Sequence, residues 1–202
     1  MRKRSVEAFG RPRLLLLIRH GKAAPKGIGL SDFERVLTSD GIAECRRMAK
    51  MLVSQVHFID QMLSSPADRA LETAHIFSRA LGFPTERIAP VPCLYSSDKT
   101  KAVIKRIKQT EQRTRVLALV GHNPMLDELA SFFVPEFSES IDKGGIVAIS
   151  FTRLPWAKIR KGSGQLAIFL APSRRGPQSI ATFRRYAGQP FHADFNKVEI
   201  PL

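Results

Sequence analysis

The chain has 202 residues, with 44% hydrophobic and 25% charged residues, which suits one globular domain and excludes an intrinsically disordered chain. The longest clean apolar run near the start, Leu14–Ile18, is too short for a membrane span or a secretory signal, so we expect no membrane contact. The formal net charge of +14 is concentrated in residues 1–13, 99–115 and 153–185. We interpret it as solvated surface charge and do not expect nucleic-acid binding, although steering of an acidic protein partner is the alternative.

Residues 1–12 are basic and without periodicity, which predicts a flexible leader. The apolar run that follows predicts a buried strand over Arg13–Arg19. Residues 21–37 are rich in glycine and proline and predict a loop. The helical periodicity of Thr38–Gln55 then predicts a helix, with Thr38 as its N-cap.

The middle of the chain alternates strands and helices. We expect a strand over Phe58–Leu63, a helix that starts at Ser65-Pro66 with the serine as cap and ends at Gly82, a weak edge strand over Arg87–Leu94, and a basic amphipathic helix over Lys99–Thr110.

The last third begins with a clear buried strand over Val116–Val120. A helix capped by Asn123, with Pro124 in its first turn, should follow it. Two further strands are predicted over Gly145–Phe151 and Gln165–Leu170, whereas residues 172–202 form an extension of unknown role. This pattern predicts one α/β domain over residues 13–171, a three-layer sandwich whose mostly parallel central sheet has helices on both faces.

Four side chains are placed to meet a single anion, because ligands of such folds collect outside the carboxyl ends of the strands. These are Arg19, His20, Arg69 and His122. Two guanidinium groups can hold phosphate oxygens, and a protonated His122 would hold another. A neutral His20 can attack phosphorus and form a covalent phosphoenzyme. Gly21 lets the backbone turn sharply and leaves room for a ligand.

Several ordered motifs resemble one family. They are Arg19-His20-Gly21, Asp32-x-x-Arg35-x-Leu37-Thr38-x-x-Gly41, Ser65-Pro66-x-x-Arg69-Ala70-x-x-Thr73-Ala74 and Val120-Gly121-His122-Asn123-Pro124. Over residues 13–170 the chain is similar to the histidine phosphatase superfamily, also called phosphoglycerate-mutase-like, and within it to the SixA-type phosphohistidine phosphatases.

The resemblance implies roles for the residues that match these motifs. His20 would be the phosphorylated nucleophile, and Arg19, Arg69 and His122 would form the phosphate pocket without a metal or another cofactor. Arg35 would steady the loop after the nucleophile and could reach the phosphate, so phosphate or sulfate is an expected ligand.

The general acid is left open. Many members of the family carry a glutamate after the third strand, but here the segment Pro92–Asp98 contains none. Asp98 is a candidate, although we favour its interpretation as a helix N-cap. A missing acid disfavours alkoxide leaving groups, whereas the nitrogen of a phosphoramidate can be protonated before cleavage. We therefore expect phosphohistidine as the substrate.

The interval between Arg69 and His122 has no room for a large lid, which suggests an open cleft suited to a phosphorylated protein. The sequence thus predicts a metal-independent phosphatase of phosphohistidine on a signalling protein, such as a histidine phosphotransfer domain. The alternatives are a phosphatase for a small phosphorylated metabolite and a catalytically weak phosphate-binding or interaction module. Cys45 and Cys93 have no metal-ligand spacing, so we expect no zinc site and a reducing cytoplasmic location.

Overall fold

The computed structural model describes residues 12–27, 31–96 and 99–172. Its centre is a six-stranded sheet in the order β3-β2-β4-β1-β5-β6. The strands are β1 Arg13–Arg19, β2 Gln61–Ser64, β3 Ala89–Pro90, β4 Val116–Gly121, β5 Ile146–Phe151 and β6 Gln165–Leu170. The pairs from β3 to β1 are parallel, and β5 is antiparallel to both β1 and β6. The predicted α/β class with a mostly parallel sheet is confirmed.

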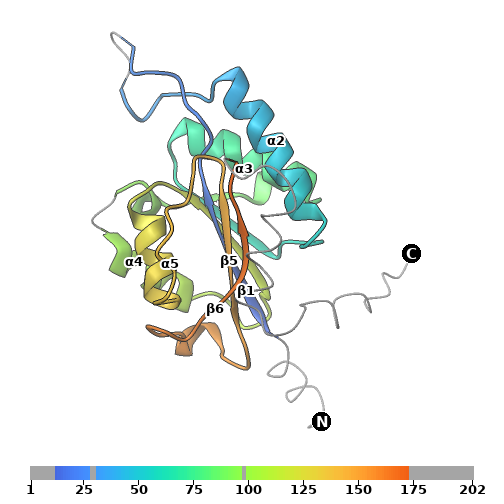
Figure 1. Ribbon diagram of the computed structural model, residues 1–202, viewed down its shortest axis with the longest axis vertical. Helices are drawn as coiled ribbons and strands as arrows, with labels where there is room; N and C mark the ends of the chain where they lie inside the picture. Colours follow the sequence, from blue (N-terminus) through green and yellow to red (C-terminus); the bar gives the residue numbers. More distant parts are fainter. Residues whose placement is uncertain (1–11, 28–30, 97–98, 173–202) are drawn as a thin grey trace.

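Helices lie on both sides of the sheet, with α2 and α3 on one face and α4 and α5 on the other (Figure 1). They are α2 Ser39–Val53, α3 Asp68–Ala80, α4 Thr100–Lys108 and α5 Met125–Phe133, and short 3-10 turns occupy Thr85–Arg87, Pro92–Leu94 and Trp156–Lys158. The central strand β1 explains the layering, because Leu14 and Leu16 pack in the core under α2 and α3 whereas Leu15 and Leu17 pack under α4 and α5. Because both faces of this strand are buried, neither set of alternating side chains faces solvent, and the strand is apolar along its whole length.

The register of the parallel strands brings distant motifs together. Arg19 in β1 pairs with Gly121 in β4, so His20 and His122 both follow directly at the same edge of the sheet. Ser64 in β2 pairs with Val120, which brings Ser65 to that edge as well. The edge is the upper end of the molecule in Figure 1, where the loop after β1 emerges.

Two predicted helix caps are wrong, and both residues have tertiary partners instead. Helix α3 begins at Asp68 without a side-chain cap, and the Ser65 hydroxyl, although it accepts a bond from the Ala67 amide, also contacts His122. Helix α5 likewise begins without a side-chain cap, and the Asn123 amide group donates to the Ile141 carbonyl oxygen, 18 positions away. Thr38, in contrast, caps α2 as predicted, since its hydroxyl accepts a hydrogen bond from the Gly41 amide.

The second and third strands differ from their predicted bounds. Strand β2 begins at Gln61 rather than at Phe58, because the Asp60 carboxylate accepts hydrogen bonds from the amides of Arg115 and Val116 at that point. Strand β3 is reduced to two residues beside a proline-rich turn, and it lies at the edge of the sheet as predicted. In the part of the chain that the structure describes, no helix is long and apolar enough to cross a membrane.

Candidate active site

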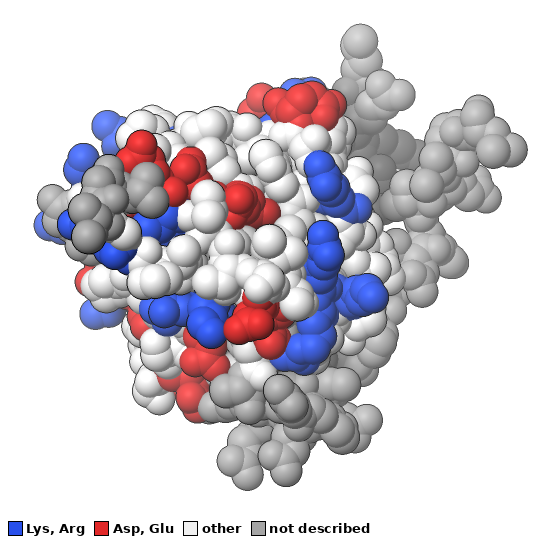
Figure 2. Space-filling view, turned by 90° about the horizontal axis from the view of Figure 1, so that it is seen from above, with Lys and Arg blue, Asp and Glu red and all other residues white. Residues whose placement is uncertain are grey.

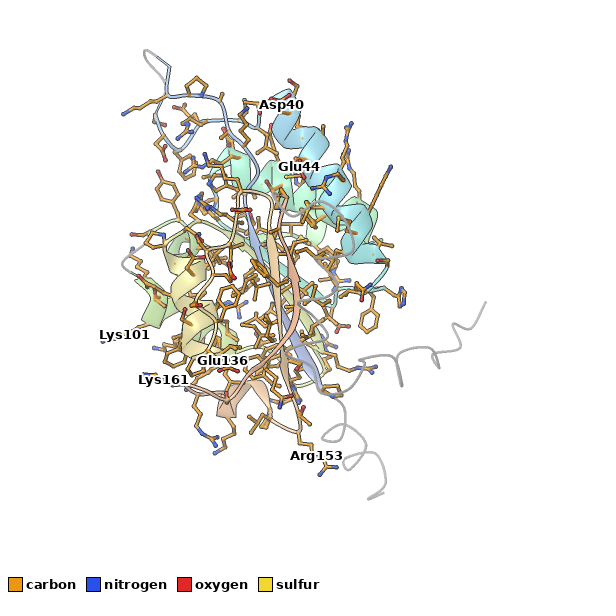
Figure 3. All side chains as sticks on the ribbon, viewed as in Figure 1. Asp40, Glu44, Lys101, Glu136, Arg153 and Lys161 are labelled. Atoms are coloured by element: carbon orange, nitrogen blue, oxygen red, sulfur yellow. The ribbon has the colours of Figure 1, made fainter. Side chains whose placement is uncertain are left out.

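The histidines at the ends of β1 and β4 form the centre of the site. The ring centroids of His20 and His122 are 4.8 Å apart, and the two residues are only 8% and 9% exposed. Arg69 lies in the first turn of α3 and Arg19 ends β1, so all four predicted residues come from the same edge of the sheet. Asp40 and Glu44 of α2 mark this end of the molecule in Figure 3, whereas Arg153 marks the opposite end.

The hydrogen bond of His20 assigns its proton. Its Nδ1 lies 2.7 Å from the carbonyl oxygen of Gly21, which can only accept, so Nδ1 carries the hydrogen. The other ring nitrogen, Nε2, therefore holds the lone pair that a nucleophile needs. Burial, with the charges of Arg69 and Arg19 adding to it, lowers the pKa of His20 to about 4. The ring is thus neutral and nucleophilic at neutral pH.

Close packing against helix α2 explains why position 21 is a glycine. A Cβ on this residue would lie 2.5 Å from the Cys45 sulfur in α2 and 3.2 Å from the carbonyl oxygen of Gly41. The Gly21 amide also donates to the hydroxyl of Thr73 in α3, at 3.1 Å. The space beside Gly21 is therefore occupied by α2, and the turn that carries His20 is held by both helices.

Asp32 lies between two arginines of the predicted site. Its carboxylate accepts a hydrogen bond from Arg69 at 2.9 Å and one from Arg35 at 2.7 Å. The bond from Arg35 is the largest cause that lowers the pKa of Asp32, so this carboxyl group is ionised. Arg35 also donates from Nε to the carbonyl oxygen of Ala24, at 2.7 Å. It thus connects Asp32 to the loop after the nucleophile.

Arg19 is oriented by a segment that the sequence did not single out. It donates from Nη1 to the Ile141 carbonyl oxygen at 2.7 Å, while its buried Nε has no hydrogen-bond partner. Burial lowers the pKa of Arg19, and the charges of Asp127 and Asp142 act in the opposite direction. Arg19 remains protonated at neutral pH, because an arginine is deprotonated only far above that range.

Asp127 holds this segment to α5. One carboxylate oxygen accepts from the Ile141 amide at 2.9 Å, and the other accepts from Ser140 and from Asn123, both at 2.7 Å. The sequence analysis assigned no role to Asp127. Ser140 and Ile141 lie 13 and 14 positions along the chain from Asp127, so no local pattern indicates these two partners.

The electrostatic setting of His122 favours its neutral form in the described site. Burial is the largest cause that lowers its pKa to about 3, followed by the charges of His20 and Arg69. Its Nε2 lies 2.8 Å from the hydroxyl of Ser65. The protonated form of His122 that we considered from the sequence would thus require a bound phosphate dianion, since a nearby negative charge favours the charged imidazole.

Two aromatic residues that the sequence analysis did not propose lie at the mouth of the site. The Tyr95 ring meets His122 edge to face with centroids 5.6 Å apart, and it meets Phe33 in the same way at 5.3 Å. Tyr95 belongs to the segment Pro92–Asp98, which contains no glutamate. Asp98, the candidate from that segment, lies outside the described residues. Within the described ranges, no group of three histidine, cysteine or acidic residues is arranged to hold a metal ion.

Comparisons with known proteins point to one family. Residues 15–90 match the model of the histidine phosphatase superfamily, branch 1. A search of curated proteins gave no match. Among solved structures, the protein histidine phosphatase SixA in complex with tungstate is 23% identical, with 79% of this chain and 97% of that chain covered and a TM-score of 0.68. A protein from Agrobacterium tumefaciens assigned to the SixA phosphohistidine phosphatases is 25% identical, with 80% and 99% covered and a TM-score of 0.67.

A mycobacterial glucosyl-3-phosphoglycerate phosphatase is more distant in sequence. It is 14% identical, with 80% of this chain and 100% of that chain covered and a TM-score of 0.57. Together the matches confirm the predicted resemblance, the phosphoglycerate-mutase-like fold and the assignment to the phosphatases.

Proposed function

We propose that this chain, which is similar to the histidine phosphatase superfamily and to SixA phosphohistidine phosphatases, hydrolyses phosphohistidine on a signalling protein through a phosphorylated His20. The observation that carries the proposal is the hydrogen bond from Nδ1 of His20 to the Gly21 carbonyl oxygen, together with the low pKa of this ring. A neutral imidazole with its lone pair on Nε2 is the form that attacks phosphorus.

The reaction has two steps. Nε2 of His20 forms a bond to phosphorus as the bond from phosphorus to the leaving group breaks, and water then attacks the phosphoenzyme and releases inorganic phosphate. Arg19 and Arg69 hold the phosphoryl oxygens, which carry negative charge throughout. Arg69 is bound to Asp32 in the described site, so this arginine is already oriented before the phosphate arrives.

Two features favour a protein substrate with a phosphorus–nitrogen bond. Between Arg69 and His122, the described residues form only elements of the three-layer fold, with no added lid over the site. The solved structures at the higher TM-scores are named for SixA phosphohistidine phosphatases. The match to a glucosyl-3-phosphoglycerate phosphatase keeps a small phosphorylated metabolite as the second candidate.

A rapid-quench experiment with a phosphohistidine-bearing phosphotransfer domain tests the proposal. The wild-type protein should form an acid-labile phosphoenzyme and release phosphate, and His20→Ala should form none. His57→Ala is the matched control, because His57 lies in the exposed connection before β2. A phosphoenzyme formed only from small phosphomonoesters would favour the metabolite. Phosphate binding without any phosphoenzyme would leave an interaction module as the function.

A further inference from the structure

Large hydrophobic side chains on the surface gather near the site. Among the described residues, those that are exposed are Phe33 at 38%, Val36 at 45% and Tyr95 at 36%. Phe33 and Val36 lie in the loop that contains Asp32 and Arg35, and Tyr95 contacts Phe33 from the other side of the site. Exposed aromatic side chains beside a reactive centre commonly mark a binding surface.

The aromatic contacts form a continuous path from the buried histidines to the surface. His20 contacts His122, His122 contacts Tyr95, and Tyr95 contacts Phe33, with centroid distances of 4.8, 5.6 and 5.3 Å. A group that leaves phosphorus and points toward solvent would therefore pass the Tyr95 and Phe33 rings. Both rings are large enough to pack against another flat ring.

A carboxylate accompanies these rings. Asp32 Oδ2 lies 3.4 Å from the Tyr95 hydroxyl, and the Asp32 side chain is 45% exposed although it also binds Arg69 and Arg35. An ionised carboxylate and the faces of two aromatic rings both attract a cation. Neither would help an anionic alkoxide to leave.

We propose that Phe33, Tyr95 and Asp32 form the leaving-group subsite, and that this subsite takes the protonated imidazole ring of a phosphohistidine. The inference rests on the proposed function and adds the residues that select the substrate.

The subsite fits the chemistry without a general acid. When the substrate ring carries a proton on its second nitrogen, the electron pair of the breaking phosphorus–nitrogen bond returns to the ring. The ring then departs as neutral imidazole, and no proton from the enzyme is needed. His20 undergoes the reverse change, since its ring gains the phosphoryl group while Nδ1 keeps its hydrogen on the Gly21 carbonyl oxygen. Asp32 and the two aromatic rings would stabilise the protonated substrate before transfer.

The test compares two substrates that share a phosphorus–nitrogen bond. One is a phosphohistidine peptide, and the other is phosphoramidate, which has no ring. In Phe33→Ala and Tyr95→Ala we expect kcat/KM for the peptide to fall about tenfold, as the loss of an aromatic or cation–π contact implies. The value for phosphoramidate should change less than about twofold, because the phosphate pocket is intact.

Two further variants serve as controls. Tyr95→Phe keeps the ring and should retain most of the activity toward the peptide. Glu34→Gln changes an exposed side chain of the same loop that bonds to Ser31 instead of facing the rings, and it should leave both substrates unaffected.

The possible outcomes separate this inference from the proposed function. Equal losses on both substrates would mean that the rings only support the pocket, and no loss on either would mean that they do not contact the substrate. Both results overturn the subsite while phospho-His20 chemistry stands. A wild-type protein that forms a phosphoenzyme with neither substrate would overturn the proposed function and the subsite together.

Discussion

Burial beside positive charge sets the chemistry of the two histidines. Neither ring has a carboxylate as its direct hydrogen-bond partner, since His20 binds a backbone carbonyl and His122 binds a hydroxyl. A carboxylate partner would raise the pKa of the imidazole, and its absence at these two contacts keeps His20 unprotonated. An unprotonated ring is what an attack on phosphorus requires.

This setting predicts a pH dependence of stability. The pKa of His20 is lowered from 6.5 to about 4 in the folded protein, so the unfolded chain binds more protons between these two values. The free energy of unfolding should therefore fall as the pH drops from about 6.5 to about 4, by about 3 kcal/mol for this residue. Urea unfolding across that range measures it. His20→Gln should lose less stability than the wild-type protein over the same interval, and an identical loss in both would contradict the assignment.

At the scale of elements, the site depends on contacts between segments that are distant in the chain. Arg19 comes from strand β1, and it donates a hydrogen bond to the carbonyl oxygen of Ile141 in the segment before β5. Asp127 of α5 holds that segment by accepting a hydrogen bond from the Ile141 amide. The Gly144 amide adds to this, because it donates to the carbonyl oxygens of both Arg19 and His20. The orientation of the phosphate-binding arginine is thus decided by three elements together.

Removal of the Asp127 carboxylate should therefore weaken anion binding. In Asp127→Ala, Ile141 loses its fixed amide contact, and we expect the dissociation constant for inorganic phosphate to rise about tenfold, as for the loss of a hydrogen bond to a charged group. Titration calorimetry measures this change. The control is Glu128→Ala in the same helix, which removes an equal charge that accepts a hydrogen bond from the Thr100 hydroxyl. A rise of similar size in both variants would indicate a general charge effect instead.

At the scale of the whole molecule, the basic charge is distributed unevenly. The end that carries the site shows basic and acidic side chains around a largely uncharged surface (Figure 2). Lys101 and Lys161 project from the side of the molecule away from Asp40 and the loop after β1 (Figure 3). Lys143 differs from them, because its charge contributes to the lowered pKa of His20.

The interpretation of the distant basic residues as solvated surface charge can be tested. The double variant Lys101→Gln, Lys161→Gln should keep kcat/KM for a phosphorylated protein within about twofold of wild type at physiological ionic strength, since salt screens the charges of exposed side chains. The measurement is made at low and at physiological ionic strength. A larger loss that disappears at high salt would show that these residues steer an acidic partner.

The sequence by itself determined the fold class and where its main parts lie. The apolar runs of β1 and β4 are buried on both faces, and the turn residues after them lie at the same edge because parallel strands end together. These signals are local, but the regular pairing of parallel strands brings residues that are far apart in the chain to the same end of the sheet. The positions of Arg19, His20 and His122 at strand ends were predictable for this reason.

Only the tertiary structure decided how the side chains of the site are held. Asp32 reaches Arg69 across 37 positions, and Ser65 reaches His122 across 57, in place of the cap predicted for Ser65. Local capping preferences amount to about 1 kcal/mol, which a buried contact with a distant partner can outweigh. The Tyr95 and Phe33 pair is likewise invisible in the sequence, because nothing in either local pattern indicates the other ring.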